Sequence, residues 1–302
     1  MISKTALCEI LETKSGLSVK RIEALGKGSS GVAFLIETYD EPYKAVVKVS
    51  KHSATLKKEK EMLDFLYRKV SLNVPKVYFF FECEDFSLLG MQYIKGISGK
   101  SRLIPLVPNK NRLAESILDA LDSIQSVKND KFGKFSSPVY DTWKEYYLDF
   151  FNEIYSFTEN KHRCGEISQN VMKAMSKIKD SFDFVFDGTV SEACLCHGDF
   201  WMPNFIIDFY KSELKGVLDP FDMLWAEPEY ELFALTVGYG KGLHLYERYK
   251  LRHAVSKHCD LKIEIYALVN ELHWFSVLGS VSSSYLEFRA KRILDKIKAH
   301  TD

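Results

Sequence analysis

The residues best suited to chemistry lie in a short polar loop between two apolar runs. Within residues 194–208, the apolar runs 194–196 and 205–207 enclose the pattern H-G-D-x-x-x-x-N. Asp199 and Asn204 are the acid and the amide of this pattern, in a loop that joins two predicted strands. A second predicted strand, residues 215–218 with Val217 and Leu218 at its end, leads into Asp219. This arrangement predicts a catalytic loop followed by a second acid at the end of a strand.

The loop resembles the H-R-D-x-x-x-x-N catalytic loop of protein kinases. Gly198 replaces the arginine, and Pro220 and Phe221 follow the second acid, which resembles the group of aminoglycoside phosphotransferases, choline kinases and fructosamine kinases. These are small-molecule kinases with a protein-kinase-like fold. The resemblance implies that ATP is the phosphoryl donor, that Asp199 orients the acceptor hydroxyl, and that Mg²⁺ is the cofactor. Its implied ligands are Asn204 and Asp219.

A glycine pattern precedes these residues in the chain. Gly26, Gly28 and Gly31 form G-x-G-x-x-G, a spacing that also occurs in dinucleotide-binding folds and in ordinary hairpin turns. Dinucleotide-binding folds place a helix after the glycines. Here residues 32–37 are β-branched and aromatic, which predicts a strand. Strand, glycine loop and strand resemble the hairpin that covers the nucleotide phosphates in kinases, so the three glycines are predicted cofactor-binding residues.

The next strand and helix supply a lysine and its expected partner. Residues 45–49 resemble the kinase V-A-I-K strand, whose lysine binds the α- and β-phosphates, and Lys48 takes that position. Residues 56–66 have helical periodicity. Glu59 lies close to the apolar face of this helix, whereas Glu61 is rotated away from it. We expect Glu59 to pair with Lys48; the alternative is that it belongs to a solvated run of charges.

The resemblance extends over about residues 20–235 and implies an α+β, bilobal fold. Residues 1–95 would form a nucleotide-clamping lobe with an antiparallel sheet, which residues 73–81 and 86–94 complete. Residues 96–302 would form a mainly helical, catalytic and acceptor-binding lobe. In related kinases adenine lies against the segment between the lobes, so Gln92 and Ile94 are predicted nucleotide contacts by position alone.

The second lobe shows apolar residues at helical spacing. They recur within residues 113–124, 143–154, 171–182 and 266–278, and helical patterns continue from residue 234 to the end of the chain. Thr142 and Glu145 form a capping box at the second of these segments. Asn109 or Asn111 would cap the first. Residues 132–138 are predicted to be a loop.

Acceptor contacts are predicted near the catalytic loop. Trp201 lies inside the loop, and Asp222, Trp225 and Glu227 follow the metal-binding acid closely. Indole faces stack on sugars and attract cations, and the acids would bind an amine. Trp201 could equally anchor the loop by packing. Glu227 and Glu231 also resemble the acids of a D-P-x-x-D-L-A helix start, in which role we treat them as structural.

Composition gives no support for several classes of partner. The 41 basic and 41 acidic residues give no electrostatic reason to expect nucleic acid or an anionic membrane as a partner. The six cysteines contain no C-x-x-C pair, and no apolar segment is long enough for a signal peptide or membrane span, which favours reduced thiols and a cytoplasmic protein. Zinc ligation by Cys194, Cys196 and His197 is the alternative, although side chains of neighbouring strand residues diverge.

The order of the motifs carries the functional prediction. Glycine loop, lysine, glutamate, catalytic loop and metal-binding acid follow one another as in kinases. Only eleven residues separate Asp219 from Glu231, which leaves little room for a segment that docks a peptide. The acceptor is therefore expected to be a small molecule, sugar-like or amine-bearing. The loop sequence 197–204, with Trp201 two residues after Asp199, resembles that of the fructosamine kinases most. The aminoglycoside kinases are next. Alternatives are a choline- or ethanolamine-type kinase and a nucleotide-binding module without catalysis, which is disfavoured because no catalytic position is missing. A dinucleotide-binding oxidoreductase is rejected because Gly31 leads into a predicted strand.

Overall fold

The computed structural model describes residues 2–28, 31–188 and 190–301. They form two compact units. Unit 1 comprises Met1–Ser123 and Met202–Phe221, and unit 2 comprises Ile124–Trp201 and Asp222–Asp302. The chain therefore passes from unit 2 to unit 1 inside the predicted catalytic loop, between Trp201 and Met202. The functional division at residue 95 stays a prediction.

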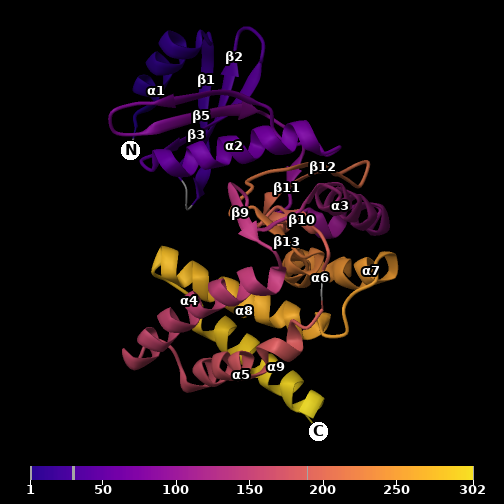
Figure 1. Ribbon diagram of the computed structural model, residues 1–302. Helices are drawn as coiled ribbons and strands as arrows, with labels where there is room; N and C mark the ends of the chain where they lie inside the picture. Colours follow the sequence, from indigo (N-terminus) through magenta and orange to yellow (C-terminus); the bar gives the residue numbers. More distant parts are fainter. Residues whose placement is uncertain (1, 29–30, 189, 302) are drawn as a thin grey trace. The chain divides into compact units, whose positions relative to one another are not determined.

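Unit 1 is built on a five-stranded antiparallel sheet (Figure 1). In sheet order the strands are β1 (Val19–Gly28), β2 (Gly31–Thr38), β3 (Lys44–Ser50), β5 (Ser87–Gln92) and β4 (Val77–Glu82). Successive side chains of a strand point to opposite faces. In β3, Val47 and Val49 therefore face one side of the sheet, and Val46 and Lys48 face the other.

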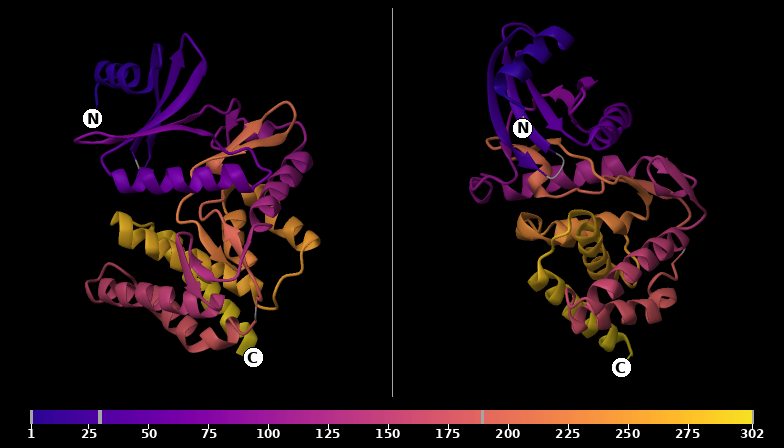
Figure 2. Two further views of the ribbon diagram at one scale, coloured as in Figure 1. Left: turned by 45° about the horizontal axis from the view of Figure 1, so that its top comes forward. Right: turned by 90° about the vertical axis from the view of Figure 1, so that its left-hand side faces the viewer.

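A helix covers each face of this sheet. On one face, α1 (Lys4–Ile10), extended by a π-helical turn over Leu11–Ser15, packs Leu7 and Leu11 against a cluster that contains Val47. On the other face, α2 (Ser53–Lys69) packs Leu56 and Leu63 against a cluster that contains Val46. The views in Figure 2 show α2 running along the sheet. Helix α2 therefore lies on the face that carries Lys48.

The rest of unit 1 contains a small sheet and a helix. The order of the sheet is β12 (Glu213–Val217), β11 (Phe205–Asp208) and β6 (Ile97–Ser98), and one-turn 3₁₀ helices lie at Ile104–Leu106 and Met202–Asn204. Helix α3 (Lys110–Gln125) begins after Asn109, whose Oδ1 accepts a hydrogen bond from the Arg112 amide at 3.0 Å. Asn109, not Asn111, is thus the cap among the two predicted candidates.

A second five-stranded sheet lies in unit 2. Its order is β7 (Lys128–Asn129), β10 (Ala193–Cys196), β13 (Leu224–Ala226), β8 (Phe132–Lys134) and β9 (Ser137–Tyr140). The prediction of a loop over residues 132–138 was wrong, because β8 and β9 form a hairpin there. The three-residue β8 has little strand signal of its own. It is held by pairing with β13 and by the complete burial of Phe132.

Helices make up the remainder of unit 2. They are α4 (Trp143–Arg163), α5 (Gln169–Val185), the 3₁₀ helix η4 (Pro228–Thr236), α6 (Gly238–Gly242), α7 (Leu245–Arg252), α8 (Cys259–Leu278) and α9 (Ser283–Thr301). The predicted capping box is present at α4, where Thr142 and Glu145 exchange side-chain and backbone hydrogen bonds. No helix among the described residues has the length and apolar character needed to cross a membrane.

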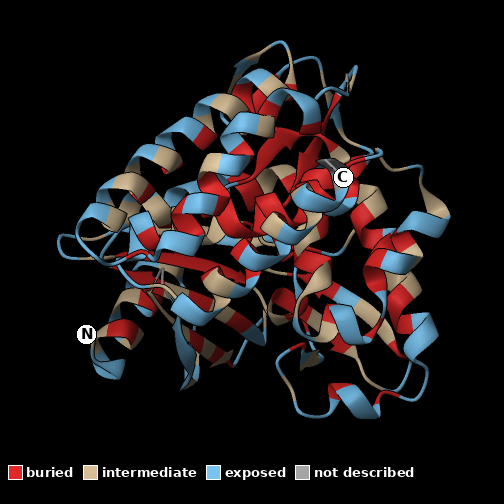
Figure 3. Ribbon diagram, turned by 90° about the horizontal axis from the view of Figure 1, so that it is seen from below, coloured by how far each residue is buried: buried red, intermediate tan, exposed pale blue. Residues whose placement is uncertain are grey.

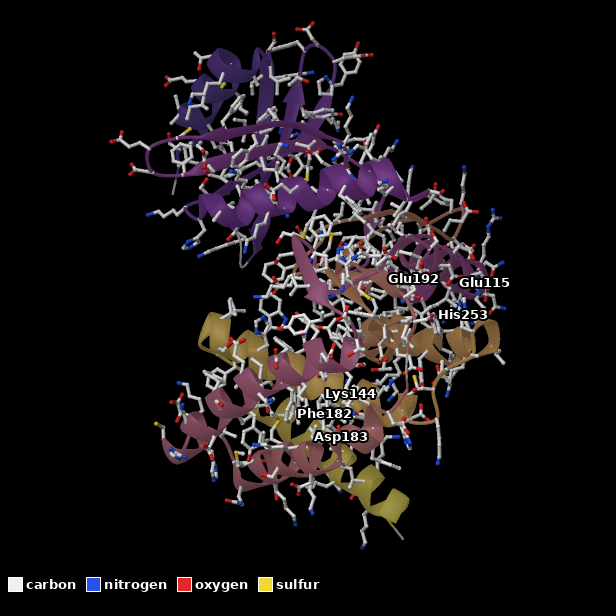
Figure 4. All side chains as sticks on the ribbon, in the orientation of Figure 1. Glu115, Lys144, Phe182, Asp183, Glu192 and His253 are labelled. Carbon is white, nitrogen blue, oxygen red and sulfur yellow. The ribbon has the colours of Figure 1, made fainter. Side chains whose placement is uncertain are left out.

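The core of unit 2 is aromatic. Tyr147 of α4 stacks on Phe182 of α5 with ring centroids 6.2 Å apart and meets Tyr266 of α8 edge to face at 4.9 Å. Figure 3 shows buried residues recurring along the helices, as expected for amphipathic elements. At the surface, Lys144 Nζ lies 2.6 Å from Asp183 Oδ1 and links α4 to α5 (Figure 4).

Candidate active site

Lys48 lies between two carboxylates in unit 1. The strand alternation of β3 directs it towards α2, where Glu59 is one of the buried residues of the helix. Lys48 Nζ is 2.5 Å from Glu59 Oε1, so the expected pairing is present. The same Nζ also contacts Asp219 Oδ1. Glu61 is exposed, as its position on the helix predicted.

Asp219 and Asn204 lie next to each other in the structure. Strands β11 and β12 pair so that Phe205 opposes Val217, and the Leu218 amide donates to the Asn204 carbonyl at 2.8 Å. Asp219 has a left-handed backbone with φ of 54°, and its side chain is 46% exposed. A non-glycine residue in this conformation costs roughly 1 kcal/mol, and such residues cluster at functional sites.

These two residues fit a magnesium ion. Mg²⁺ prefers oxygen ligands, and proteins commonly bind it through one or two carboxylates together with substrate phosphates. Asp219 offers a half-exposed carboxylate. Asn204 is buried, and its main chain pairs with Leu218, next to Asp219, so its amide oxygen as a second ligand stays a prediction. Lys48, at the same carboxylate, adds a positive charge close to where phosphates would lie.

The glycines flank the β1–β2 turn, whose Ser29 and Ser30 lie outside the described residues. Gly28 pairs with Gly31 across the two strands. Gly31 is required by packing, because a Cβ there would overlap the Val49 carbonyl and its φ of 145° disfavours other residues. A Cβ at Gly26 or Gly28 would meet no described atom within 4 Å. Packing within the described chain therefore does not explain these two glycines.

The two predicted adenine contacts, Gln92 and Ile94, have different surroundings in the structure. The Gln92 amide donates to the Lys76 carbonyl at 2.8 Å, so this N–H is already used within the protein. Ile94 is buried and faces β12, where a Cβ on Gly216 would collide with its side chain. The structure gives Gln92 a role in holding the end of the sheet, and adenine recognition by either residue stays a prediction.

The first half of the predicted catalytic loop belongs to unit 2, where Glu231 fixes its shape. The buried Glu231 carboxylate accepts hydrogen bonds from the amides of His197 at 2.5 Å, Gly198 at 3.2 Å and Phe200 at 3.3 Å. Gly198 has φ of 81°, a conformation that favours glycine. The Asp199 amide donates to His197 Nδ1 at 3.3 Å. Glu231 therefore positions the backbone around Asp199, in line with its predicted structural role.

Burial makes Glu231 sensitive to pH. Desolvation raises its pKa to about 7, against the opposing effect of the three amide donors. Between about pH 4.5 and 7 the folded state thus holds a proton that the unfolded state has lost, so the free energy of unfolding should fall as pH rises through this range. We expect Glu231→Gln to make this pH dependence shallower in denaturant titrations. Glu192→Gln, at an exposed position, should leave it unchanged, and an equal slope in both variants would contradict the assignment.

The acceptor residues predicted in unit 2 fall into exposed and buried groups. Trp201 is 40% exposed, and Asp222 has an exposed carboxylate on a left-handed backbone with φ of 47°. Trp225 is buried, and its Nε1 donates to the Phe135 carbonyl at 3.2 Å. Trp201 and Asp222 are accessible for ligand contact, whereas Trp225 is accounted for by packing beside Phe135.

Glu227 is buried within unit 2. Its carboxylate accepts hydrogen bonds from Lys262 Nζ at 3.0 and 3.1 Å and from the Tyr266 hydroxyl. Burial raises its pKa, while Lys262 and Tyr266 oppose the shift. The carboxylate is occupied by this network, so the geometry supports the structural role and not an acceptor contact. We therefore leave Glu227 out of the acceptor site.

His273 is a candidate that sequence reasoning missed. Its Nε2 lies 3.5 Å from Asp222 Oδ2, and its ring meets Phe150 edge to face at 5.3 Å. Tyr146 stacks on Phe150. Burial, followed by the charge of Asp222, raises the pKa of the Tyr146 hydroxyl well above its usual value. His273 lies 51 residues after Asp222, so the contact depends on the tertiary fold and leaves no local signal in the sequence.

Known structures resemble this fold along nearly the whole chain. A thermostable mutant of aminoglycoside phosphotransferase APH(4)-Ia in a ternary complex with AMP-PNP and hygromycin B is 18% identical, with a TM-score of 0.73 over 96% of this chain and 98% of that chain. A putative fructosamine-3-kinase from Haemophilus somnus 129PT is 16% identical, with a TM-score of 0.72 over 95% and 96%. ADP-bound aminoglycoside phosphotransferase APH(2'')-Ib is 20% identical, with a TM-score of 0.66 over 97% of both chains.

These similarities confirm the predicted kinase-like fold, with an antiparallel sheet in its N-terminal part and a helical C-terminal part. No curated protein sequence matches the chain significantly. A sequence model of the phosphotransferase enzyme family matches residues 21–253, which include the glycine strands, Lys48, the catalytic loop and Asp219. The chain belongs to the phosphotransferase enzyme family.

Proposed function

We propose that this protein transfers the γ-phosphoryl group of ATP to a hydroxyl group of a sugar-like or amine-bearing small molecule. One observation carries the proposal: Lys48 contacts both Glu59 and Asp219 within unit 1. In kinases the lysine–glutamate ion pair and the metal-binding aspartate must both be in place for phosphoryl transfer. A structural ion pair alone would not need the second, half-exposed carboxylate.

Unit 1 would bind the donor. Lys48 would hold the α- and β-phosphates, and the open space beside Gly26 and Gly28 would let backbone amides approach them. Asn204 and Asp219 would hold Mg²⁺, which neutralises charge on the phosphates when bound. With donor and charge fixed in this way, positioning and electrostatics supply most of the rate enhancement in phosphoryl transfer.

Unit 2 would orient the acceptor. Asp199 would accept a hydrogen bond from the reacting hydroxyl and take its proton as transfer proceeds. Glu231 would keep Asp199 in place through the three backbone amides of the loop. The carboxylate of Asp199 would thus act on the acceptor, and Glu231 would act only through the loop.

The exposed residues of unit 2 suggest the chemistry of the acceptor. Trp201 offers a flat apolar face, and Asp222 with His273 offers a carboxylate beside an imidazole. An amine would be attracted to Asp222, and a sugar would stack on Trp201 and bond to either polar group. The similar structures, one with hygromycin B and one named a putative fructosamine-3-kinase, are consistent with both acceptor types.

Trp201→Ala tests the acceptor contact. We expect it to raise the KM of the acceptor by about tenfold through loss of the indole face, with little change in the KM of ATP. Steady-state kinetics would measure both constants. Tyr210→Ala removes an aromatic ring that is 89% exposed in unit 1 and should change neither. An unchanged acceptor KM with a lower melting temperature would instead make Trp201 a packing anchor of the loop.

The function itself is tested by acceptor-dependent ADP formation. Purified protein with ATP and Mg²⁺ would be supplied in turn with ketoamines, aminoglycosides, choline and simple sugars. We expect at least one class to stimulate ADP release, with ketoamines or aminoglycosides above choline. If no class stimulates it, the proposed acceptor chemistry is wrong.

A further inference from the structure

Unit 2 contains a cavity that the proposed reaction does not use. Its volume is about 490 Å³, and it lies among η4, α6, α7, α8 and α9, the helices of the C-terminal part of the chain (Figure 1). Small-molecule sites commonly span about 300–1,000 Å³, so the cavity has the size of a ligand site. None of its lining residues belongs to the catalytic loop or to the predicted acceptor contacts.

Two guanidinium groups share one carboxylate at this cavity. Arg289 Nη1 lies 2.6 Å from one oxygen of Glu264, and Arg292 Nε lies 2.5 Å from the other. The side chains of Arg289 and Glu264 are each only 4% exposed. The Arg292 side chain is 48% exposed, so its guanidinium can be reached from the solvent. One negative charge thus faces two positive charges, one buried and one half exposed, which leaves a local excess of positive charge.

The other charged groups do not cancel this excess. Basic side chains outnumber acidic ones by five to three in the lining, and Asp260 already has partners. It accepts a hydrogen bond from the Tyr246 hydroxyl at 2.5 Å and lies 3.8 Å from Lys250 Nζ. An anion entering the cavity would therefore meet a positive potential, and a cation would be repelled.

Apolar and aromatic surfaces complete the lining. Leu235, Val237 and Ile263 contribute aliphatic side chains, and the Phe288 ring is 53% exposed. The Arg292 guanidinium lies 5.5 Å from the centre of the Phe288 ring. An exposed ring beside a guanidinium can receive a flat apolar group and an anionic group on the same ligand.

We propose that this cavity binds a small organic anion, with a carboxylate or phosphate group at Arg292 and Lys250 and an apolar ring against Phe288. The proposal rests on two features of one cavity: the Glu264 carboxylate pairs with both Arg289 and Arg292, and the exposed Phe288 ring lies beside Arg292. It does not depend on the phosphotransferase reaction. The site is separate in sequence and composition from the residues assigned to ATP and acceptor.

Phenyl phosphate is a suitable probe because it combines an aromatic ring with an anionic group. Ligand-observed NMR on the full-length protein should show saturable binding of phenyl phosphate, and binding of neutral benzyl alcohol should be at least about tenfold weaker. Arg292→Gln and Lys250→Gln should each weaken phenyl phosphate binding by about tenfold through loss of a charge-assisted hydrogen bond. Thermal melts would confirm that both variants are folded.

Two control variants locate the binding. Lys291→Gln changes the exposed neighbour of Arg292 on α9, which does not line the cavity, and should leave the affinity unchanged. Lys48→Met should also leave it unchanged, because it alters only the proposed nucleotide site. The proposal is overturned if wild-type protein shows no saturable binding, if benzyl alcohol binds equally well, if both cavity variants keep full affinity, or if Lys48→Met abolishes binding.

Discussion

Asp199→Asn is expected to lower kcat by at least about 10³-fold while ATP affinity stays close to that of the wild type. The amide cannot take the proton from the acceptor hydroxyl, but it has nearly the same size as the carboxylate. The backbone hydrogen bonds to Glu231 should therefore hold the loop in the same shape. The predicted phosphate and metal contacts, Lys48 and Asp219, are unaltered, so binding and catalysis should separate in this variant.

Calorimetric ATP titrations and initial rates with a responsive acceptor would measure this separation. Asp183→Asn is a matched control, because Asp183 is an exposed acid of unit 2 whose pairing with Lys144 lies on the surface (Figure 4). It should retain full activity, since exposed ion pairs contribute little to stability. Turnover of Asp199→Asn at the control's rate would remove Asp199 from the mechanism.

Asp219→Asn should weaken Mg²⁺-dependent ATP binding by at least about tenfold, because a hard cation loses an anionic oxygen ligand. Asparagine tolerates the left-handed backbone of this position, so the exchange tests the charge without adding backbone strain. Asp219→Ala would remove the ligand as well and should be at least as damaging. Its effect would include the cost of alanine at a φ of 54°.

Titrations of ATP with and without Mg²⁺ distinguish the metal effect from a general loss of affinity. The wild type should bind ATP more tightly with Mg²⁺, and Asp219→Asn should lose most of this difference. Asp208→Asn, on β11 of the same unit, is a control outside the proposed metal site. An unchanged Mg²⁺ effect in Asp219→Asn would exclude Asp219 as a ligand.

Local periodicity predicted much of unit 1. The resemblance to the kinase V-A-I-K strand paired Lys48 with a glutamate on the next helix, and helical spacing selected Glu59 for that role. The structure pairs the two residues. The capping box at Thr142 was equally local, since its donors and acceptors lie within four residues. Features that depend on residues close together in the chain leave patterns in the sequence, so the position of Glu59 and the capping box could be predicted.

Contacts over long sequence separations could not be predicted in the same way. The short strand β8 depends on pairing with β13, some 90 residues later, so its own residues indicated a loop. Lys262 and Tyr266 engage Glu227 from a helix 35 to 39 residues away, which turned a predicted ligand contact into a buried network. The proximity of His273 to Asp222 has the same origin. The sequence showed only the apolar periodicity of α8, and that periodicity does not indicate which residue His273 contacts.

The central claim is most directly tested by ³¹P NMR of the complete reaction. Protein, ATP, Mg²⁺ and the acceptor that best stimulates ADP release would be followed over time. We predict loss of the γ-phosphate signal of ATP, formation of ADP in equal amount, and a new phosphate monoester signal that is absent with Asp199→Asn. Formation of inorganic phosphate in place of the monoester, or a γ-phosphate signal that does not change, would contradict the assignment of this protein as a small-molecule kinase.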